Sequence, residues 1–435
     1  MHYALAYGAD AVYAGQPRYS LRARNNDFMQ ENLANGIAEA HRQGKKFFVA
    51  SNLLPHNNKL KTYLKHMEPI IDLAPDALIM ADPGLIMMVR ERWPEIPVHL
   101  SVQANTMNWA GVKFWQSLGL KRIILSRELS LDEIAEIRQE CPDMELEVFV
   151  HGALCIAYSG RCLLSSYFNH RDSNQGTCTN ACRWEYQVHD AKKTDTGDYH
   201  RIDFDAMGAF ENPEPFQGTD IERHPLADEV YLIEESKRPG ELMPIMEDEH
   251  GTYIMNSKDL RAIQHVGTLT QMGIDSLKIE GRTKSHYYVA RTAQLYRQAI
   301  DDADAGKEFN PELYQKLEGL ANRGYTDGFL QRHPKKETQN YLKGASKSEY
   351  QQFVGEIRDY DEQSGMAEVV IKNKLVCGDS IELITPSGSR TMTIERMENL
   401  KGKTIEGAPG AGYEVRIPLP SANYEMGLIA RYLPD

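Results

Sequence analysis

The sequence predicts a (β/α) barrel of the TIM type followed by a small C-terminal β-barrel domain. Short apolar runs alternate with amphipathic stretches over the first 155 residues, whereas after Phe353 short alternating runs follow one another closely. Repeated strand–helix units imply a parallel sheet, and so many of them favour a closed barrel over a doubly wound open sheet. No G-x-G-x-x-G follows any of the runs, so the usual mark of a dinucleotide-binding sheet is missing.

The elements of the barrel are expected in regular alternation. The strands are expected at 10–14, 46–50, 76–80, 97–102, 122–125, 145–150, 252–255 and 276–279. The helices are expected at 31–43, 60–73, 111–118, 131–140 and from Ser285 to about Leu320. Ser130, with Glu133 three residues later, predicts a capping box at the start of the helix at 131–140.

Composition divides the rest of the chain. The barrel is expected to span 1–332, with a charged, aperiodic insertion at about 190–250 that packs loosely on it and is not a domain. Residues 333–350 form a polar linker, and 351–435 form an all-β domain in which Cys377 is expected to be buried. The chain opens with MHYALAYGADAVYAG, inside an expected helix, so we expect the first barrel strand to be missing from this sequence.

The bulk composition limits the function classes. The 435 residues suggest two or three domains, and the net charge of −13 argues mildly against a protein that binds nucleic acid over a broad basic surface. The sequence has neither 18 consecutive apolar residues nor a basic leader followed by an apolar run. We therefore expect a cytoplasmic protein without membrane contact.

Four of the six cysteines lie in one short stretch with the spacing C-x6-C-x15-C-x3-C: Cys155, Cys162, Cys178 and Cys182. Clustered cysteines in a reducing cytosol bind metal or carry out redox chemistry more often than they form disulfides. Only the last pair fits a zinc knuckle, and iron–sulfur ligands vary more in spacing. The spacing alone leaves zinc and an iron–sulfur cluster equally open, with a structural role as the simplest explanation.

Polar residues recur where the expected strands end, and the carboxyl ends of barrel strands share one face. They include Asn52, Asp82, Gln103, Asn105, Arg127, Glu128, His151, Lys278, Glu280 and Arg282. Any single one of them is explained by a polar turn, but as a set they predict a site rim. We assign Glu280, Arg282, His151 and Arg127 to substrate positioning and proton transfer.

The segment SLKIEGRTKSHYYVARTAQLYRQ combines basic and aromatic residues. Such a mixture suits single-stranded RNA, whose bases stack on aromatic rings while phosphates pair with Arg and Lys. The alternative, which we favour for the helix, is a helix with Tyr287, Tyr288 and Tyr296 in the core and its arginines in solvent.

Hydrolase motifs are missing from the sequence. Neither H-E-x-x-H nor G-x-S-x-G occurs. A cysteine nucleophile with His151 as its base is the remaining arrangement, but four grouped thiols are an unusual way to build one nucleophile.

Residues 147–165, EVFVHGALCIAYSGRCLLS, resemble the signature of the peptidase U32 (collagenase-like) family, E-x-F-x2-G-[SA]-[LIVM]-C-x4-G-x-C-x-[LIVM]-S. Further stretches resemble the same family, including GADAVYAG at 8–15, LSVQAN at 100–105, NQGTCTNACRWEY at 174–186 and SLKIEGRTKS at 276–285. The resemblance covers nearly the whole chain. Many relatives carry a further cysteine where this chain has Arg261, and the family's opening strand is missing, which would leave the barrel unpaired at one seam.

The resemblance is closest to a branch that converts the wobble uridine of tRNA to 5-hydroxyuridine. It implies a 4Fe–4S cluster on Cys155, Cys162, Cys178 and Cys182, with Cys182 the least certain ligand, and prephenate as a co-substrate. It also implies tRNA, the iron–sulfur assembly machinery and an electron-transfer protein as partners. The alternatives are a collagenase-like peptidase and a non-catalytic tRNA-binding accessory protein.

Overall fold

The computed structural model covers most of the barrel region and the C-terminal region. It describes residues 1–20, 30–153, 186–193, 199–201, 231–235, 242–245, 247–248, 251–252, 259–281, 284–320, 325–331 and 350–433. Within these ranges, no helix has the length and apolar character that a bilayer crossing requires.

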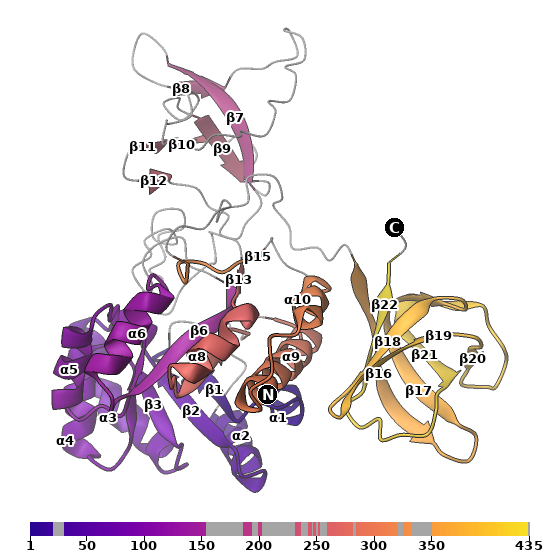
Figure 1. The fold of residues 1–435 in the computed structure, drawn as a ribbon, viewed down its shortest axis with the longest axis horizontal. Helices are drawn as coiled ribbons and strands as arrows, with labels where there is room; N and C mark the ends of the chain where they lie inside the picture. The colour runs from indigo at the N-terminus through magenta and orange to yellow at the C-terminus, as the bar shows by residue number, and fades with distance from the viewer. Residues whose placement is uncertain are drawn as a thin grey trace.

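Seven parallel strands form the barrel sheet. The first six pair in chain order: β1 (Ala11–Gly15), β2 (Lys46–Ser51), β3 (Ala77–Met80), β4 (Val98–Leu100), β5 (Arg122–Ile124) and β6 (Glu145–Ala153). The seventh, β14 (Ser276–Ile279), pairs with β6 (Figure 1). This parallel α/β sheet is typical of a TIM-like barrel and confirms the predicted fold class.

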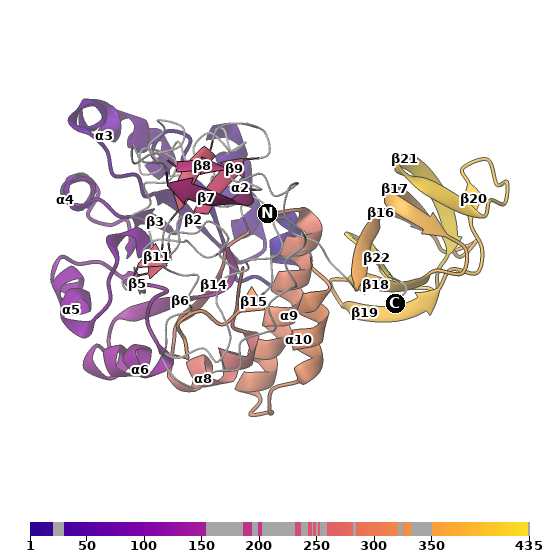
Figure 2. The same ribbon diagram turned by 90° about the horizontal axis from the view of Figure 1, so that it is seen from above.

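Helices follow the strands and surround the sheet (Figure 2). They are α1 (His2–Ala6), α2 (Gln30–Arg42), α3 (Asn57–Ile71), α4 (Pro83–Arg92), α5 (Trp109–Ser117), α6 (Leu131–Glu140), α8 (Val266–Gln271), α9 (His286–Asp304) and α10 (Pro311–Glu318), with 3-10 turns η2 (Val102–Ala104) and η7 (Ile263–His265). The predicted capping box is present at α6, where the Ser130 hydroxyl accepts a hydrogen bond from the Glu133 backbone and the Glu133 carboxylate accepts one from the Ser130 backbone. The sequence therefore located this helix start correctly.

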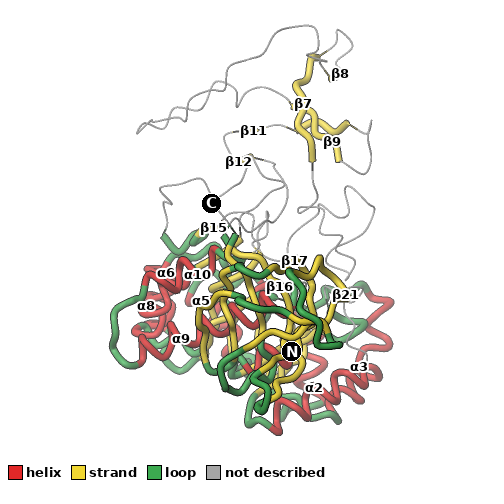
Figure 3. The backbone as a smooth tube through the Cα atoms, turned by 90° about the vertical axis from the view of Figure 1, so that its right-hand side faces the viewer, coloured by secondary structure: helices red, strands yellow, loops and turns green. Residues whose placement is uncertain are grey.

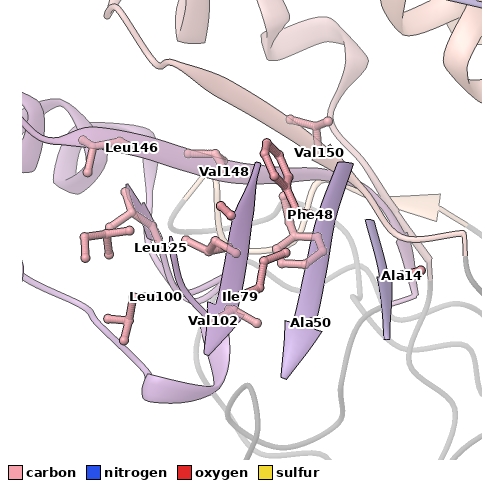
Figure 4. Packing of buried hydrophobic residues seen from close by; sticks show 14 of the residues in the cluster. Ala14, Phe48, Ala50, Ile79, Leu100, Val102, Leu125, Leu146, Val148 and Val150 are labelled. Carbon is pink, nitrogen blue, oxygen red and sulfur yellow. The ribbon is translucent and has the colours of Figure 1, made fainter. Parts of the chain in front are cut away.

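The apolar residues of the strands make one large core with the helices. Five of the six residues of β2, and all of β3 and β4, are buried. Parallel strands covered on both faces are expected to be apolar almost without interruption. Figure 4 shows part of this packing, with Phe48, Ile79, Leu100 and Val148 close together.

Between β1 and β14 the barrel sheet has a seam at which no backbone pairing is present in the described part of the chain. Among the described strands, β1 pairs only with β2, and β14 pairs only with β6. Side chains cross the seam instead of backbone hydrogen bonds. The Tyr13 hydroxyl of β1 donates a 2.8 Å hydrogen bond to Glu280 Oε2, directly after β14.

The strand expected at 252–255 was assigned wrongly to the barrel. β12 (Gly251–Thr252) pairs with β11 (Glu247–Asp248) in a separate two-stranded sheet, and 253–255 lie outside the described residues. β13 (Asp259–Arg261) joins the barrel sheet instead, antiparallel to the end of β6, and β15 (Tyr325–Thr326) pairs with β13. A three-residue strand gives too short a pattern to be read from sequence.

The insertion contains more regular structure than its sequence indicated. β7 (Tyr186–Lys193), β8 (Tyr199–Arg201), β9 (Tyr231–Glu235) and β10 (Leu242–Ile245) form an antiparallel sheet in the order β10-β9-β7-β8. Figure 3 shows this sheet standing away from the barrel. β7 pairs with β9 across 41 to 49 positions of the chain, from Asp190 with Tyr231 to Tyr186 with Glu235, so no local turn signal announces the pairing.

The C-terminal region is an all-antiparallel β domain, as predicted. Its strands are β16 (Gln351–Asp361), β17 (Met366–Val376), β18 (Ser380–Thr385), β19 (Gly388–Thr393), β20 (Glu398–Asn399), β21 (Gly407–Pro418) and β22 (Leu428–Tyr432), in the order β19-β18-β22-β16-β17-β21-β20. Its core is formed by aliphatic residues such as Val354, Ile371 and Leu383. Cys377, expected to be buried, is only partly buried. The linker before this domain lies outside the described residues apart from Tyr350.

The two regions share a packed junction. Ile384 and Leu428 of the β domain belong to the hydrophobic core of the barrel region. The rings of Tyr287 and Phe353 stack with their centroids 4.8 Å apart. At the centre, the buried Arg291 guanidinium donates to both carboxylate oxygens of Glu382, each at 2.7 Å. The prediction that Arg291 faces solvent was therefore wrong.

Candidate active site at the carboxyl ends of the barrel strands

Buried polar side chains collect where β2, β4 and β5 end. Asn52 Nδ2 lies 3.4 Å from Ser101 Oγ, which lies 3.4 Å from Gln103 Oε1. Asn105 has a left-handed backbone with φ of 56° and accepts a 3.0 Å hydrogen bond from Ser126. Such a conformation is uncommon outside glycine and is tolerated best by Asn and Asp. The rim that the sequence predicted is therefore present at these strand ends.

Arg127 fixes the end of β6. Its Nη1 donates a 2.6 Å hydrogen bond to the carbonyl of Ala153, and its guanidinium lies 4.3 Å from the centre of the Phe149 ring. Cys155 follows Ala153 by two residues in the sequence. Arg127 therefore holds the last described residue before the cysteine segment.

His151 lies in an aromatic enclosure at the end of β6. The rings of Tyr288, Tyr296 and Tyr325 surround it, with centroids 5.4–5.6 Å from its own. Its exposed fraction is 1%. Burial lowers the pKa of His151 to about 3, and the charges of Arg261 and Lys284 act in the same direction. His151 is thus a neutral imidazole near pH 7.

Glu280 lies beside His151 and is bound from both sides of the seam. Its backbone N–H donates to the His151 carbonyl at 2.9 Å, and its carboxylate accepts from Tyr13. Gly152, with φ of +111°, lies against the backbone of Glu280. A Cβ at this position would lie only 2.5 Å from the Glu280 carbonyl oxygen. A glycine is needed for the strand ends to approach so closely.

Lys278, which the sequence analysis placed at the rim, lies inside the barrel. Its Nζ donates a 2.7 Å hydrogen bond to Glu147, which also accepts from Arg122 at 3.0 Å. Burial alone would raise the pKa of Glu147, but the charges of Lys278 and Arg122 outweigh burial and hold it at about 2. The Lys278 ammonium also lies 4.0 Å from the centre of the Tyr13 ring. The barrel interior therefore carries a charged layer beneath the rim.

Sequence reasoning missed a second polar group, on β13 and α10. The buried Arg261 guanidinium lies between the rings of Tyr314 and Tyr325, at 3.5 and 4.4 Å, and donates to Glu318 at 2.5 Å. Arg261 pairs across the strands with His151. The one signal in the sequence that pointed to Arg261 was that many relatives carry a cysteine at this position.

Helix α9 does not offer a stacking surface for RNA. Ser285 caps the helix where the sequence placed its start, but Tyr287, Tyr288 and Tyr296 are buried at 6%, 4% and 2% exposure. Bases cannot stack on rings that are already enclosed by protein. The core-packing interpretation of these tyrosines is confirmed.

Arg282 and the four clustered cysteines, Cys155, Cys162, Cys178 and Cys182, lie outside the described residues. Within the residues that the structure does describe, no group of three or more His, Cys, Asp or Glu side chains is placed to hold a metal ion.

Comparison with known proteins identifies the family. The pattern of peptidase family U32 matches residues 1–340, and that of the peptidase family U32 C-terminal domain matches residues 349–431. The chain is similar to tRNA hydroxylation protein P of Escherichia coli (strain K12), with 61% identity over 97% of this chain and 91% of that protein. It is also similar to tRNA hydroxylation protein P of Haemophilus influenzae, with 58% identity over 100% of this chain and 94% of that protein.

A more distant relative acts on a different RNA. The 23S rRNA 5-hydroxycytidine C2501 synthase of Escherichia coli (strain K12) is 30% identical over 68% of this chain and 37% of that protein. Both family patterns, one after the other, account for nearly all of the chain. The protein therefore belongs to peptidase family U32 and carries that family's C-terminal domain.

Proposed function

We propose that this protein hydroxylates the wobble uridine of tRNA at C5 to give 5-hydroxyuridine. The observation that carries the proposal is the 61% identity, over 97% of the chain, to a protein named for tRNA hydroxylation. The relative named for 5-hydroxycytidine synthesis supports C5 as the position of hydroxylation, because its product is also a pyrimidine hydroxylated at C5. The peptidase alternative is weakened by the lack of the common hydrolase motifs.

The donor set fits an iron–sulfur cluster. Cys155, Cys162, Cys178 and Cys182 would hold it as four thiolates, the set that a 4Fe–4S cluster takes. When bound, the cluster would supply electron transfer or a binding point for the oxygen donor. Prephenate is proposed separately, as a co-substrate. The proposal also requires the iron–sulfur assembly machinery and an electron-transfer partner.

The residues of the rim suit the positioning of a base and the movement of protons. Neutral His151 can accept a hydrogen bond, and Glu280, whose backbone binds that of His151, offers a carboxylate for proton transfer. Arg127 holds the chain that leads to Cys155. Arg282 completes the proposed set from the sequence alone.

Nucleoside mass spectrometry of tRNA tests the function. A deletion strain is expected to lose 5-hydroxyuridine and its derivatives, and the wild-type gene is expected to restore them. Cys155→Ser and Cys162→Ser variants are expected not to restore them. The matched controls are Cys141→Ser and Cys377→Ser, because the Cys141 thiol is buried in the barrel core and the partly buried Cys377 packs against the core of the C-terminal domain. Unchanged tRNA in the deletion strain would refute the proposal.

Metal analysis tests the cofactor separately. Anaerobically purified protein is expected to contain iron and acid-labile sulfide, and to lose both in the Cys155→Ser variant. Zinc at one per chain with no iron would reject the cluster. Proteolysis of collagen-like peptides that survives loss of the metal would instead support the peptidase alternative, and tRNA binding without any change in nucleosides would support the accessory role.

A further inference from the structure

The tautomer of His151 is fixed by the hydroxyl of Tyr296. That hydroxyl lies 2.7 Å from the Val150 carbonyl oxygen and 3.3 Å from His151 Nδ1. It has one hydrogen to donate, a carbonyl can only accept, and 2.7 Å is the usual length of an O–H···O bond. The hydrogen therefore goes to Val150. The phenol oxygen accepts from the Ala262 backbone N–H at 3.2 Å, and its second lone pair is left as an acceptor for a hydrogen on Nδ1.

A neutral imidazole with its hydrogen on Nδ1 has a lone pair on Nε2. His151 Nε2 is fully buried and has no hydrogen-bond partner among the described residues. The hydroxyl of Tyr288, whose ring lies 5.6 Å from the His151 ring, is likewise buried and without a partner in the part of the chain that the structure describes. Leaving a buried polar atom unsatisfied costs about 1–3 kcal/mol, so both atoms call for a bound group.

We propose that His151 Nε2 and the Tyr288 hydroxyl form a binding site for a neutral O–H or N–H donor. A bare lone pair attracts a donor and repels an acceptor, so this site excludes carboxylate and phosphate oxygens at Nε2. The nearby cations do not attract an anion to Nε2, because Arg261 already binds Glu318 and Lys284 already binds Asp259. Tyr296 is a positioning residue, since it acts only through His151.

The donor has two possible chemical sources, and this point rests on the proposed function. In uridine hydroxylation, the imide N–H of the uracil ring is a neutral donor of the required kind. An ordered water molecule is the other. Both satisfy the same lone pair, so the tautomer itself can be tested whether or not the protein hydroxylates tRNA.

The test is nitrogen NMR of the full-length protein labelled with ¹⁵N-histidine, with the His151 signals identified by their loss in His151→Gln. At pH 7 we expect Nδ1 to show a bound hydrogen and Nε2 to show a bare lone pair. Tyr296→Phe removes the acceptor for the Nδ1 hydrogen and is expected to shift the tautomer toward Nε2–H. Tyr325→Phe is the matched control and is expected to leave the tautomer unchanged, because the Tyr325 ring lies against His151 whereas its hydroxyl donates to the Leu317 carbonyl. Thermal unfolding verifies that each variant is folded.

Adding an anticodon stem-loop distinguishes the two sources. A uridine stem-loop that moves the Nε2 signal, while its N3-methyluridine counterpart does not, would identify the imide N–H as the donor. Equal signals with both would identify water. A hydrogen on Nε2 or an imidazolium at pH 7 in the wild-type protein would overturn the inference. If Nε2 carries a bare lone pair but deletion of the gene leaves tRNA unchanged, the proposed function is refuted and the inference about His151 stands.

Discussion

The barrel interior and the junction with the C-terminal domain each bury an ion pair, and the two pairs have different surroundings. Inside the barrel, Glu147 is shared by Lys278 and Arg122. At the junction, Arg291 binds both oxygens of Glu382, and Gln351 donates one further hydrogen bond to that carboxylate. The first is a network with two cations, whereas the second is a closed pair with a neutral helper.

This difference decides what each pair can do. The barrel network extends to further side chains: Arg122 also binds Glu145, and Lys278 lies against Tyr13, which binds Glu280 at the rim. A closed pair cancels its own field and fixes the relative placement of the two elements that carry it. Removing one partner of a buried pair is costly in either case, because it leaves an uncompensated charge. Only the barrel network is connected to the candidate site.

The largest expected effect is that of Glu147→Gln. The substitution removes the carboxylate that binds the buried Lys278 and leaves Arg122 with the half-exposed Glu145 as its remaining carboxylate partner. We expect the free energy of unfolding to fall by about 3–5 kcal/mol, as measured by urea denaturation at pH 7. Adding Lys278→Met should not restore full stability, because Arg122 remains.

Stability measurements at acid pH provide the control for the Glu147→Gln variant. The pKa of Glu147 is held near 2, below the ordinary value of 4.5. A depressed pKa in the folded state stabilises it above pH 4.5, and that contribution is lost as the pH falls from 4.5 toward 2. The stability difference between the wild type and Glu147→Gln should therefore shrink over this range. A constant difference would show that the pair is not ionised in the folded protein.

Arg291→Met is expected to have a smaller effect. It leaves Glu382 buried with Gln351 as its remaining donor, and we expect a loss of about 3 kcal/mol in urea denaturation. Because the pair is closed, the double variant Arg291→Met/Glu382→Met should recover part of that loss. Hydroxylation of tRNA per folded molecule should be unchanged in both variants. A double variant as unstable as the single one would contradict the description of this pair as self-contained.

The smallest expected effect comes from two matched tyrosines. Tyr13→Phe removes the hydrogen bond to Glu280 at the rim, and we expect tRNA hydroxylation to fall about tenfold, which corresponds to about 1.4 kcal/mol in the barrier. Tyr7→Phe removes the hydrogen bonds from the Tyr7 hydroxyl to the carbonyls of Ile384 and Met426 at the junction. It should cost about 1 kcal/mol of stability and leave hydroxylation unchanged. Equal losses of activity in Tyr13→Phe and Tyr7→Phe would show that the rim and the junction do not differ in their contribution to hydroxylation.

Apolar periodicity predicted the parts of the fold in which buried residues recur at a short, regular spacing along the chain. The strand–helix alternation to residue 150, the capping box at Ser130 and the alternating strands after Phe353 all appear in the structure. The insertion sheet and β13 were missed, because their pairing joins short segments far apart in sequence. The cysteine spacing and the family resemblance supplied the proposed chemistry, and periodicity contributed nothing to it.

The sequence by itself determined the family through its motifs, and its periodicity determined the order of the elements to residue 150 and the strand ends at which His151 and Glu280 lie. Local physics suffices for that, because apolar periodicity and capping act within a few residues of each other. Only the tertiary structure decided that Lys278 points into the barrel, that Arg291 is buried against Glu382, and that the Tyr296 hydroxyl lies against His151 Nδ1. Each of these depends on partners more than 90 positions apart in sequence or on a different strand or helix, and a side chain's charge state and hydrogen bonds are set by such neighbours and by burial.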